Sequence, residues 1–293
     1  MVPTYGREEV LCETLRSLLG LDLQGCEITV VDQNARHEPL THDYLSSIAG
    51  RIRLLQQSPS LPRARNAGWR AAAGDIVLYL DDDVIPHPGL IEAHCRAYDN
   101  PAVGGVAGRV RTIGFPAPEV PASRSRWPVV GWLFFNLAQT VPAEVATARG
   151  CNMSFRRALL EELRGFDERY APSPYRNESD FCFRVRQRGY RLVFVPEAAV
   201  DHLMHETGGV RGGGRDESLR PEHHVDNFRF FWTHISWHHR PLTLLAFLAQ
   251  ELLTRRARSA ARGWRQNAAV LTLFARGLCL GYRSARSGPW PSR

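Results

Sequence analysis

Two short apolar segments, each ending in aspartate, constrain the fold of this chain more than any other feature. Ile28–Val31 is rich in β-branched residues and stops at Asp32, and Ile76–Leu80 stops at the run Asp81–Asp83. Between them, the alanine- and arginine-rich stretch Leu61–Ala73 has the pattern of a helix. Strands that alternate with helices predict βαβ units, and therefore an α/β fold with a mainly parallel sheet flanked by helices. Ligands of such sheets bind beyond the carboxyl ends of the strands, where both groups of aspartates are expected.

The two ends of the chain differ from this pattern. Only Met1 and Val2 precede the turn-like Pro3–Gly6, so either the first strand is a stub or the true start lies upstream. Residues 240–293 hold ten arginines and one acid, a net charge of +9, whereas residues 1–239 carry a net charge of −2. From Asp226 onward the pattern is helical and increasingly basic. We therefore expect an α/β domain over residues 1–225 and a basic helical extension over 226–293.

Composition excludes several classes of protein. The six cysteines include no Cys-x-x-Cys pair, which argues against a zinc site or a disulfide framework and suits a reducing cytosol. No secretory segment opens the chain, and no apolar run approaches the roughly 20 residues that span a bilayer. Because the basicity is confined to the tail, we expect no nucleic-acid partner. The expected location is cytoplasmic, either free or peripheral at the inner face of the cell membrane.

The three consecutive aspartates need a positive partner, because neighbouring carboxylates repel and raise one another's pKa. If the strand stays extended to Asp83, Asp81 and Asp83 lie on one face and Asp82 on the other. Two carboxylates on one side of a sheet edge suit Mg²⁺ or Mn²⁺. The alternative is a solvated turn, since aspartate is common before turns that contain proline.

Eight short motifs follow one another along most of the chain. They are PTYGRE, VVDQN, RARNAG, LDDDV, GCNMSFRR, GFDE, NESDFCFRVRQRGYRL and PEAAVDH. Together, from Val2 to about Arg211, they resemble the pattern of glycosyltransferase family 2 on a GT-A fold. Each motif alone is weak, but eight in this order are specific. The resemblance implies an enzyme that transfers a sugar, with inversion, from a nucleotide-diphosphate sugar.

The resemblance also implies a donor site held by a divalent cation, Mg²⁺ or Mn²⁺. It makes Asp83 and His202 the metal ligands, while the neighbouring His205 is the second candidate. The implied donor-binding residues are Pro3, Thr4, Asp32 at the nucleotide base, Arg65 in the RN motif, and Asp81 or Asp82 near the ribose. A metal ion neutralises the charge that develops on a nucleoside diphosphate leaving group without any proton transfer.

An acceptor hydroxyl needs a carboxylate within hydrogen-bond distance to take its proton. The resemblance assigns this general base to Glu178, with Asp180 as the alternative, although both could simply cap the helix that follows. The glycine-rich stretch 208–215 predicts a mobile loop. That loop either closes over the donor and brings Arg211 or Arg215 to the diphosphate, or is a plain surface linker.

Departures from the family pattern narrow the function. The residues after VVD, Gln33 to Arg36, replace the usual acidic and serine residues, which weakens the base and ribose assignments. The QxxRW motif and transmembrane helix of processive synthases are missing, so we expect transfer of single sugars. The expected acceptor is a glycan or lipid-linked molecule of cell-envelope, surface polysaccharide or glycolipid synthesis. Three alternative functions remain. The first is a nucleotidyltransferase, which would need a glycine-rich phosphate loop. The others are a nucleic-acid binder that uses the arginine tail and a degenerate glycosyltransferase.

The C-terminal extension contains a candidate membrane-binding surface. An apolar helix face is followed by a group of arginines: Leu242, Leu244, Leu245, Phe247, Leu248, Leu252 and Leu253, then Arg255, Arg256, Arg258, Arg262 and Arg265. Such a helix suits an anionic membrane interface. The alternative is that the leucines pack onto the catalytic domain and the arginines are solvated.

Overall fold

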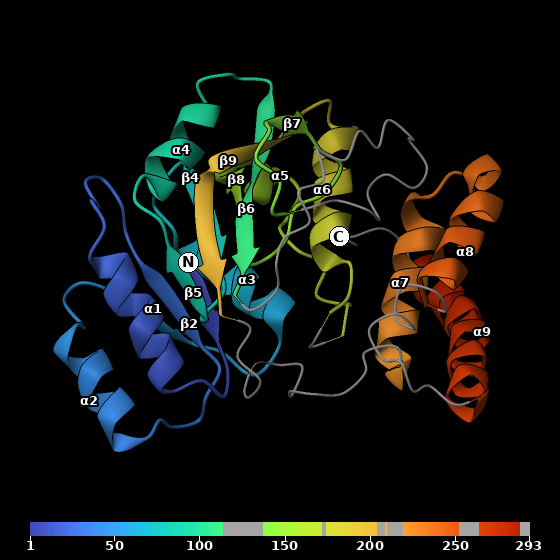
Figure 1. Ribbon diagram of the computed structural model, residues 1–293, viewed down its shortest axis with the longest axis horizontal. Coiled ribbons are helices and arrows are strands. Elements are labelled where there is room, and N and C mark those ends of the chain that lie inside the picture. Colours follow the sequence, from blue (N-terminus) through green and yellow to red (C-terminus); the bar gives the residue numbers. More distant parts are fainter. Residues whose placement is uncertain (114–136, 172–173, 204–208, 210–218, 252–263, 288–293) are drawn as a thin grey trace.

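The structure, a computed structural model, describes residues 1–113, 137–171, 174–203, 209, 219–251 and 264–287 (Figure 1). Its first sheet has the order β1-β2-β3, and both pairs of strands are parallel. These strands are β1 (Val2–Thr4), β2 (Thr29–Asp32) and β3 (Arg53–Gln56), with helices α1 (Glu9–Leu19) and α2 (Pro39–Ser47) between them. The α/β class and the parallel arrangement predicted for this part of the chain are confirmed.

The second sheet is mixed. It has the order β4-β8-β6-β9-β5, with β7 added beside β9, and β6 and β9 form its one parallel pair among the described strands. The strands are β4 (Ile76–Leu80), β5 (Val84–Pro86), β6 (Val103–Thr112), β7 (Ala143–Glu144), β8 (Asn152–Arg156) and β9 (Arg191–His202). The sequence did not indicate these antiparallel pairs, because an apolar run reveals burial while the direction of its neighbour depends on the connections.

Met1 joins the two sheets. Its carbonyl oxygen accepts a hydrogen bond from the Leu80 amide (3.1 Å), and its ammonium group donates to the Leu78 carbonyl oxygen (2.9 Å). The short strand β1 therefore lies between β2 and β4. Burial lowers the pKa of the Met1 ammonium group to about 6.

Two hydrophobic cores lie on opposite faces of β4. Leu78 and Leu80 contribute to the core that includes α1, whereas Val77 and Tyr79 contribute to an aromatic core with Phe155. This alternation follows from the two-residue period of a strand. The remaining helices of this part are α3 (Leu61–Ala71), α4 (Leu90–Ala97), α5 (Arg157–Glu162) and α6 (Asn177–Gln187). Helix α3 packs against β1 and β2, α4 and α6 pack against β6 and β9, and α5 packs against β8.

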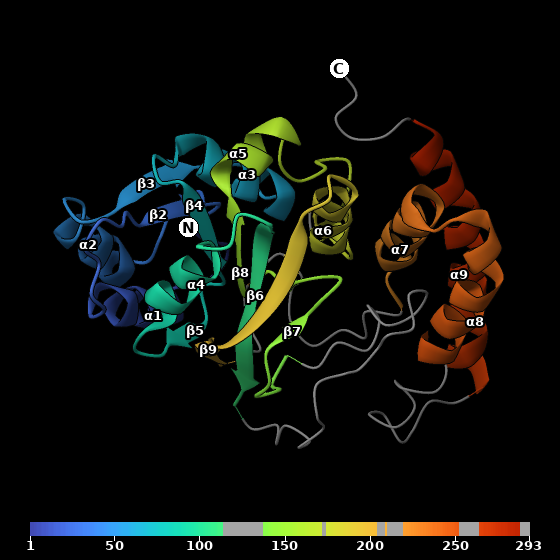
Figure 2. The same cartoon turned by 90° about the horizontal axis from the view of Figure 1, so that it is seen from above.

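The C-terminal helices form a separate group beside α6 (Figures 1 and 2). They are α7 (Pro221–His234), the short 3-10 helix η3 (Trp237–His239), α8 (Arg240–Ala249) and α9 (Trp264–Arg286). Phe228, Phe231, Phe247 and Phe274 fill the space between them. A Cβ atom at Gly281 of α9 would lie 2.5 Å from the Phe228 Cβ, so glycine permits the close approach of α7 and α9. Within the part of the chain that is described, no helix is both long and apolar enough to cross a bilayer.

Candidate active site

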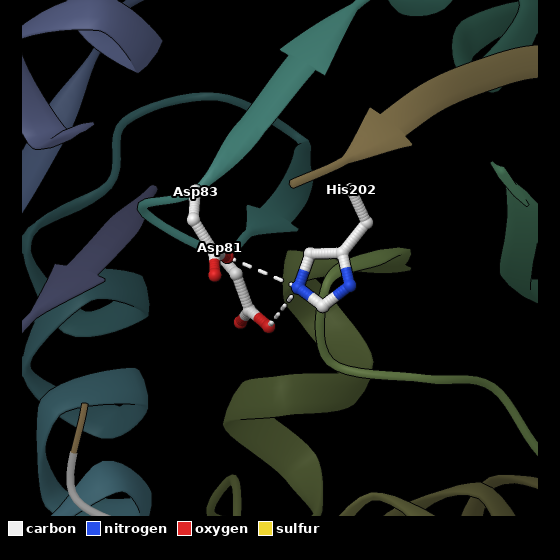
Figure 3. Close-up of side chains that lie close together, drawn as sticks. All are labelled: Asp81, Asp83 and His202. Atoms are coloured by element: carbon white, nitrogen blue, oxygen red, sulfur yellow. Dashed lines mark ion pairs between the residues drawn. The ribbon is translucent and has the colours of Figure 1, made fainter. Parts of the chain in front are cut away.

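Asp81, Asp83 and His202 meet at the carboxyl ends of β4 and β9 (Figure 3). The His202 Nε2 atom lies 3.0 Å from Asp83 Oδ1 and 4.0 Å from Asp81 Oδ2. All three ligand atoms lie within 4.8 Å of one another, so the group could hold a metal ion. Two carboxylates and an imidazole form a donor set that suits Mn²⁺ and, through its oxygens, Mg²⁺.

Backbone pairing brings these residues together. Val84 of β5 pairs with His202, and the Leu203 amide donates a hydrogen bond to the Asp83 carbonyl oxygen (2.9 Å). The Thr14 hydroxyl of α1 donates to the carbonyl oxygens of Asp82 and Val84, which fixes the turn after β4. Strand β4 ends at Leu80, so the condition for strand alternation, an extended chain up to Asp83, is not met. A fixed turn, not strand alternation, places Asp81 and Asp83 on the same side.

Arg7 supplies a positive charge beside the aspartates. Its Nη2 atom lies 3.1 Å from Asp83 Oδ2, and its Nε atom lies 3.9 Å from Asp82 Oδ1. Both carboxylates and the guanidinium are buried. Burial raises the pKa of the Asp82 carboxyl to about 7, although Arg7 opposes this rise. Arg7 belongs to the PTYGRE motif, but no pattern in the sequence distinguishes it as a site residue.

Asp32 at the end of β2 lies in its own polar network. Its Oδ1 accepts hydrogen bonds from the Asn34 amide (2.9 Å) and side chain (2.8 Å), and its Oδ2 lies 3.0 Å from His37 Nε2. His37 in turn contacts Glu8 of the segment before α1 (3.2 Å). A cavity of about 310 Å³ opens here, lined in part by Asp32, Asn34, Arg36 and His37. Next to it, Pro3 and Thr4 pair with Val31 and Asp32 in the parallel register.

A larger apolar cavity, of about 670 Å³, lies at the opposite ends of the strands, and none of the candidate site residues line it.

Arg65 and Glu178 form a second charged pair. Arg65 Nη1 lies 3.0 Å from Glu178 Oε1 and donates to Asn177 Oδ1 at 3.0 Å, and Arg65 itself is 1% exposed. Gly150 lies directly against this pair: a Cβ atom there would come within 1.8 Å of Arg65 Nη2 and 2.8 Å of Glu178 Oε1. Burial raises the pKa of the neighbouring Cys151 thiol, and the charges of Asp81, Asp83 and Glu178 raise it further. Cys151 directly follows Gly150 and therefore lies next to the Arg65–Glu178 pair.

Asp180, two residues beyond Glu178, has a different environment. Its Oδ2 accepts a hydrogen bond from Arg184 Nε (2.9 Å), and its Oδ1 lies 2.7 Å from His234 Nε2 on α7. Only 3% of Asp180 is exposed. Burial alone would raise its pKa, but Arg184 and His234 outweigh burial and hold the pKa below its usual range. These contacts favour a structural role for Asp180, whereas Glu178 is more exposed.

The remaining candidates lie outside the described residues. These are His205, Arg211 and Arg215 of the glycine-rich stretch. Gly209 is described, and its amide donates to the Tyr5 carbonyl oxygen at 2.7 Å. The predicted loop therefore keeps one contact with the PTYGRE motif and is otherwise not described.

Comparison with known protein families shows to which family the chain belongs. The family described as "Glycosyl transferase family 2" matches residues 1–164, more than half of the chain. The chain belongs to glycosyl transferase family 2. Strands β1 to β8, with the aspartate run and Arg65, fall within the matched residues.

The relatives of this family 2 enzyme are distant in sequence, but all three described below carry the names of sugar transferases. It is 27% identical over 219 residues to the glucosyl-dolichyl phosphate glucuronosyltransferase of Haloferax volcanii, covering 70% of this chain and 69% of that protein. It is 26% identical over 210 residues to the uncharacterized glycosyltransferase YwdF of Bacillus subtilis, covering 71% and 74%. In the probable glycosyltransferase YdaM of the same organism, 22% identical, the match spans only 51% of that protein and 72% of this chain.

Solved structures support the fold. The mannosyltransferase PcManGT from Pyrobaculum calidifontis, in complex with GDP-Man and Mn²⁺, has a TM-score of 0.57 and 18% identity over 100% of this chain and 86% of that one. GalNAc-T7 with UDP, GalNAc and Mn²⁺ has a TM-score of 0.62 and 14% identity over 98% of this chain and 55% of that one. Both neighbours have the GT-A fold, so the predicted GT-A architecture is confirmed, and the protein is a glycosyltransferase.

Proposed function

We propose that this glycosyltransferase moves one sugar from a nucleotide-diphosphate sugar to a hydroxyl acceptor, with a divalent cation and with inversion at the anomeric carbon. The observation that carries the proposal is the group Asp81, Asp83 and His202 at the carboxyl ends of the strands. In α/β sheets these ends form the ligand-binding edge. Mn²⁺ in both structural neighbours supports a divalent cation in this fold.

The residues at this edge fit a cation and a diphosphate. A bound Mg²⁺ or Mn²⁺ would supply charge neutralisation for the leaving diphosphate. Asp83 and His202 are the proposed metal ligands, and Asp81 or Asp82 would contact the donor near its ribose. Arg7 fixes the orientation of Asp83 through the contact at 3.1 Å, so the chain itself preorganises this carboxylate.

Glu178 is the proposed general base. Its carboxylate takes the proton of the acceptor hydroxyl, the acceptor oxygen forms the new bond to the anomeric carbon, and the bond to the diphosphate oxygen breaks with its electron pair. Arg65 orients Glu178 through the contact at 3.0 Å, and Gly150 leaves room for this pair. One base acting opposite the leaving group supports inversion.

The donor and acceptor classes follow from the relatives. The neighbours were solved with GDP-Man and with UDP and GalNAc, which supports a nucleoside diphosphate donor at Asp32 and the aspartate run. The name of one relative includes dolichyl phosphate, which supports a lipid-linked acceptor. We propose a role in the synthesis of cell-envelope or surface glycans or glycolipids.

A thermal-shift screen tests the donor proposal. We expect GDP or UDP to raise the unfolding temperature in the presence of Mn²⁺ and not in EDTA, because a ligand that binds only the folded state stabilises it. At about 100 times Kd the stabilisation is about 2.7 kcal/mol. Adenosine and inorganic phosphate serve as controls. Equal shifts with and without Mn²⁺ would contradict metal dependence, and no shift with any nucleotide would contradict the donor proposal.

A membrane surface is the proposed partner of the C-terminal helices. Phe247, Leu244 and Leu248 pack among the phenylalanines of the C-terminal helices. Other apolar side chains are exposed, namely Trp237 (77%), Leu242 (43%) and Leu245 (64%). Leu252, Leu253 and the arginines at 255, 256, 258 and 262 lie outside the described residues, as does the side chain of Arg265. Exposed tryptophan and leucine in an arginine-rich tail support an anionic lipid interface.

Vesicle sedimentation tests this partner. We expect the protein to sediment with vesicles containing phosphatidylglycerol, less so in high salt, and not with pure phosphatidylcholine. The double variant Trp237→Ser, Leu245→Ser should lose most of the bound fraction because it removes the exposed apolar contacts. Leu271→Ser on α9, also exposed, is the matched control. Equal binding to both vesicles, or to neither, would leave only the packing role.

A further inference from the structure

Arg176 has an unusual backbone conformation directly before the proposed base. It is the N-cap residue of α6 with φ 74°, in the left-handed region that an arginine rarely adopts. Its side chain is not in solvent, since the residue is only 7% exposed. A strained, buried arginine persists only where its surroundings hold it, and such positions cluster at functional sites.

The surroundings that hold Arg176 come from the C-terminal helices. Its Nε donates a hydrogen bond to Asn227 Oδ1 on α7 (3.1 Å), and its Nη2 donates to Gln250 Oε1 just after α8 (3.5 Å). The guanidinium also lies over the rings of Tyr175 at 4.4 Å and Phe247 at 5.8 Å. Two helices outside the α/β domain therefore fix this one side chain.

Arg176 lies two residues before Glu178, which pairs with Arg65. The Arg176 carbonyl oxygen accepts the first hydrogen bond of α6, from the Asp180 amide (2.8 Å). The next two residues, Asn177 and Glu178, both contact Arg65. A rotation at residue 176 therefore moves both contacts at once.

Helix α7 also contacts the chain around Arg176 through two other side chains. Asp226 accepts hydrogen bonds from the Ala171 and Tyr175 amides (3.3 and 3.1 Å). His234, at the other end of α7, contacts Asp180. The loop before α6 and the first turn of α6 are thus both attached to α7.

We propose that Arg176 is a positioning residue, through which Asn227 and Phe247 of the C-terminal helices set the orientation of Glu178. The inference rests on the proposed role of Glu178 as general base. It gives the C-terminal helices a part in the reaction besides any surface role. A displacement of reacting groups by about 1 Å can lower turnover about 10²-fold, so a positioning residue has a measurable effect.

The decisive variant is Arg176→Gly. Glycine adopts the same positive φ without strain, so the backbone can be kept while the side-chain anchor is lost. The matched control is Arg164→Gly, because Arg164 is also a non-glycine residue with positive φ (54°) but is exposed. Release of nucleoside diphosphate is measured with the best wild-type donor from a panel of GDP-mannose and UDP-hexoses, with Mn²⁺.

We expect Arg176→Gly to lower kcat by about 10–100-fold with Kd for the nucleoside diphosphate within twofold of wild type. Arg164→Gly should keep kcat within twofold. Asn227→Ala should lower kcat in the wild-type background but not further in Arg176→Gly, because both act through one contact. A loss of folded protein or of nucleotide-binding stoichiometry in proportion to kcat would overturn the inference in favour of a purely structural role.

The inference and the proposed function fail in different ways. If Glu178→Gln loses turnover while Arg176→Gly keeps it, the positioning role is wrong and the base assignment stands. If Glu178→Gln keeps wild-type turnover, the base assignment is wrong and the positioning role fails with it. An additive double variant with Asn227→Ala would also contradict the proposal.

Discussion

Glu178→Gln is expected to lower kcat by about 10²–10⁴-fold, because the amide keeps the shape of the side chain but cannot accept the acceptor's proton. Binding of the nucleoside diphosphate should persist, since Glu178 is not one of the proposed metal ligands or donor-binding residues. The measurement is steady-state turnover with the donor and Mn²⁺, beside nucleotide binding by calorimetry. Glu162→Gln is the matched control: Glu162 makes an exposed ion pair with Arg188 at the far end of α6.

Asp180→Asn separates the two acidic candidates. Asp180 contacts Arg184 and His234 inside the protein, so removing its charge leaves the buried Arg184 guanidinium without its carboxylate partner. Breaking a buried pair of this kind costs about 3–5 kcal/mol of stability. We therefore expect a lower unfolding temperature as its main effect. Wild-type turnover in Glu178→Gln, with a loss of turnover in folded Asp180→Asn, would transfer the role of base to Asp180.

Asp83→Asn is expected to abolish the dependence of nucleotide binding on Mn²⁺. The substitution removes the charge of a proposed metal ligand but retains an oxygen that can accept the hydrogen bond from Arg7. Alanine would be a poorer choice, because it leaves the buried Arg7 guanidinium without its nearest carboxylate. The variant should therefore stay folded, and the unfolding temperature in EDTA should lie near that of the wild type.

Calorimetric titration of GDP or UDP with and without Mn²⁺ measures this effect. Asp99→Asn is the control, because it makes the same chemical change at an exposed site beyond α4. If Asp83→Asn binds nucleotide with the same Mn²⁺ enhancement as wild type, Asp83 is not a metal ligand. An unfolding temperature in EDTA well below that of the wild type would instead indicate that Asp83 stabilises the fold through Arg7.

Local patterns predicted the parts of the site that lie within one element. Strand β4 has the predicted bounds, Ile76–Leu80, because a buried apolar run lies between Gly74-Asp75 and the aspartates. Strand β9 is longer than its predicted apolar run, residues 191–195, and continues to His202. Pro196 argues against a continuous strand, but β6 pairs with β9 on both sides of an irregularity in β9 between Val195 and Ala199, opposite Gly108 and Arg109. Tertiary pairing here overrides the local signal.

The contacts that arrange the site could not be read from the sequence. Arg7 reaches Asp83 across the edge of the sheets, and Asn227 reaches Arg176 from another group of helices. Both contacts join residues far apart in the chain, and no periodicity encodes such pairs. Positive φ at a non-glycine residue likewise leaves no trace in the composition. The family motifs located Arg65 and Glu178, but only the three-dimensional arrangement reveals that they form a pair.

The pairing of β5 with β9 also has a consequence for how the protein folds. Asp83 and His202 lie far apart in the chain, and they meet only after β9, the last strand in the described residues, has closed a long loop against β5. Loop closure of this kind is entropically unfavourable until the sheet is complete. Partly folded chains therefore lack the full ligand set. Any free energy gained when a cation binds to these three side chains adds to the free energy of unfolding. The ion therefore stabilises only chains in which the sheet is complete.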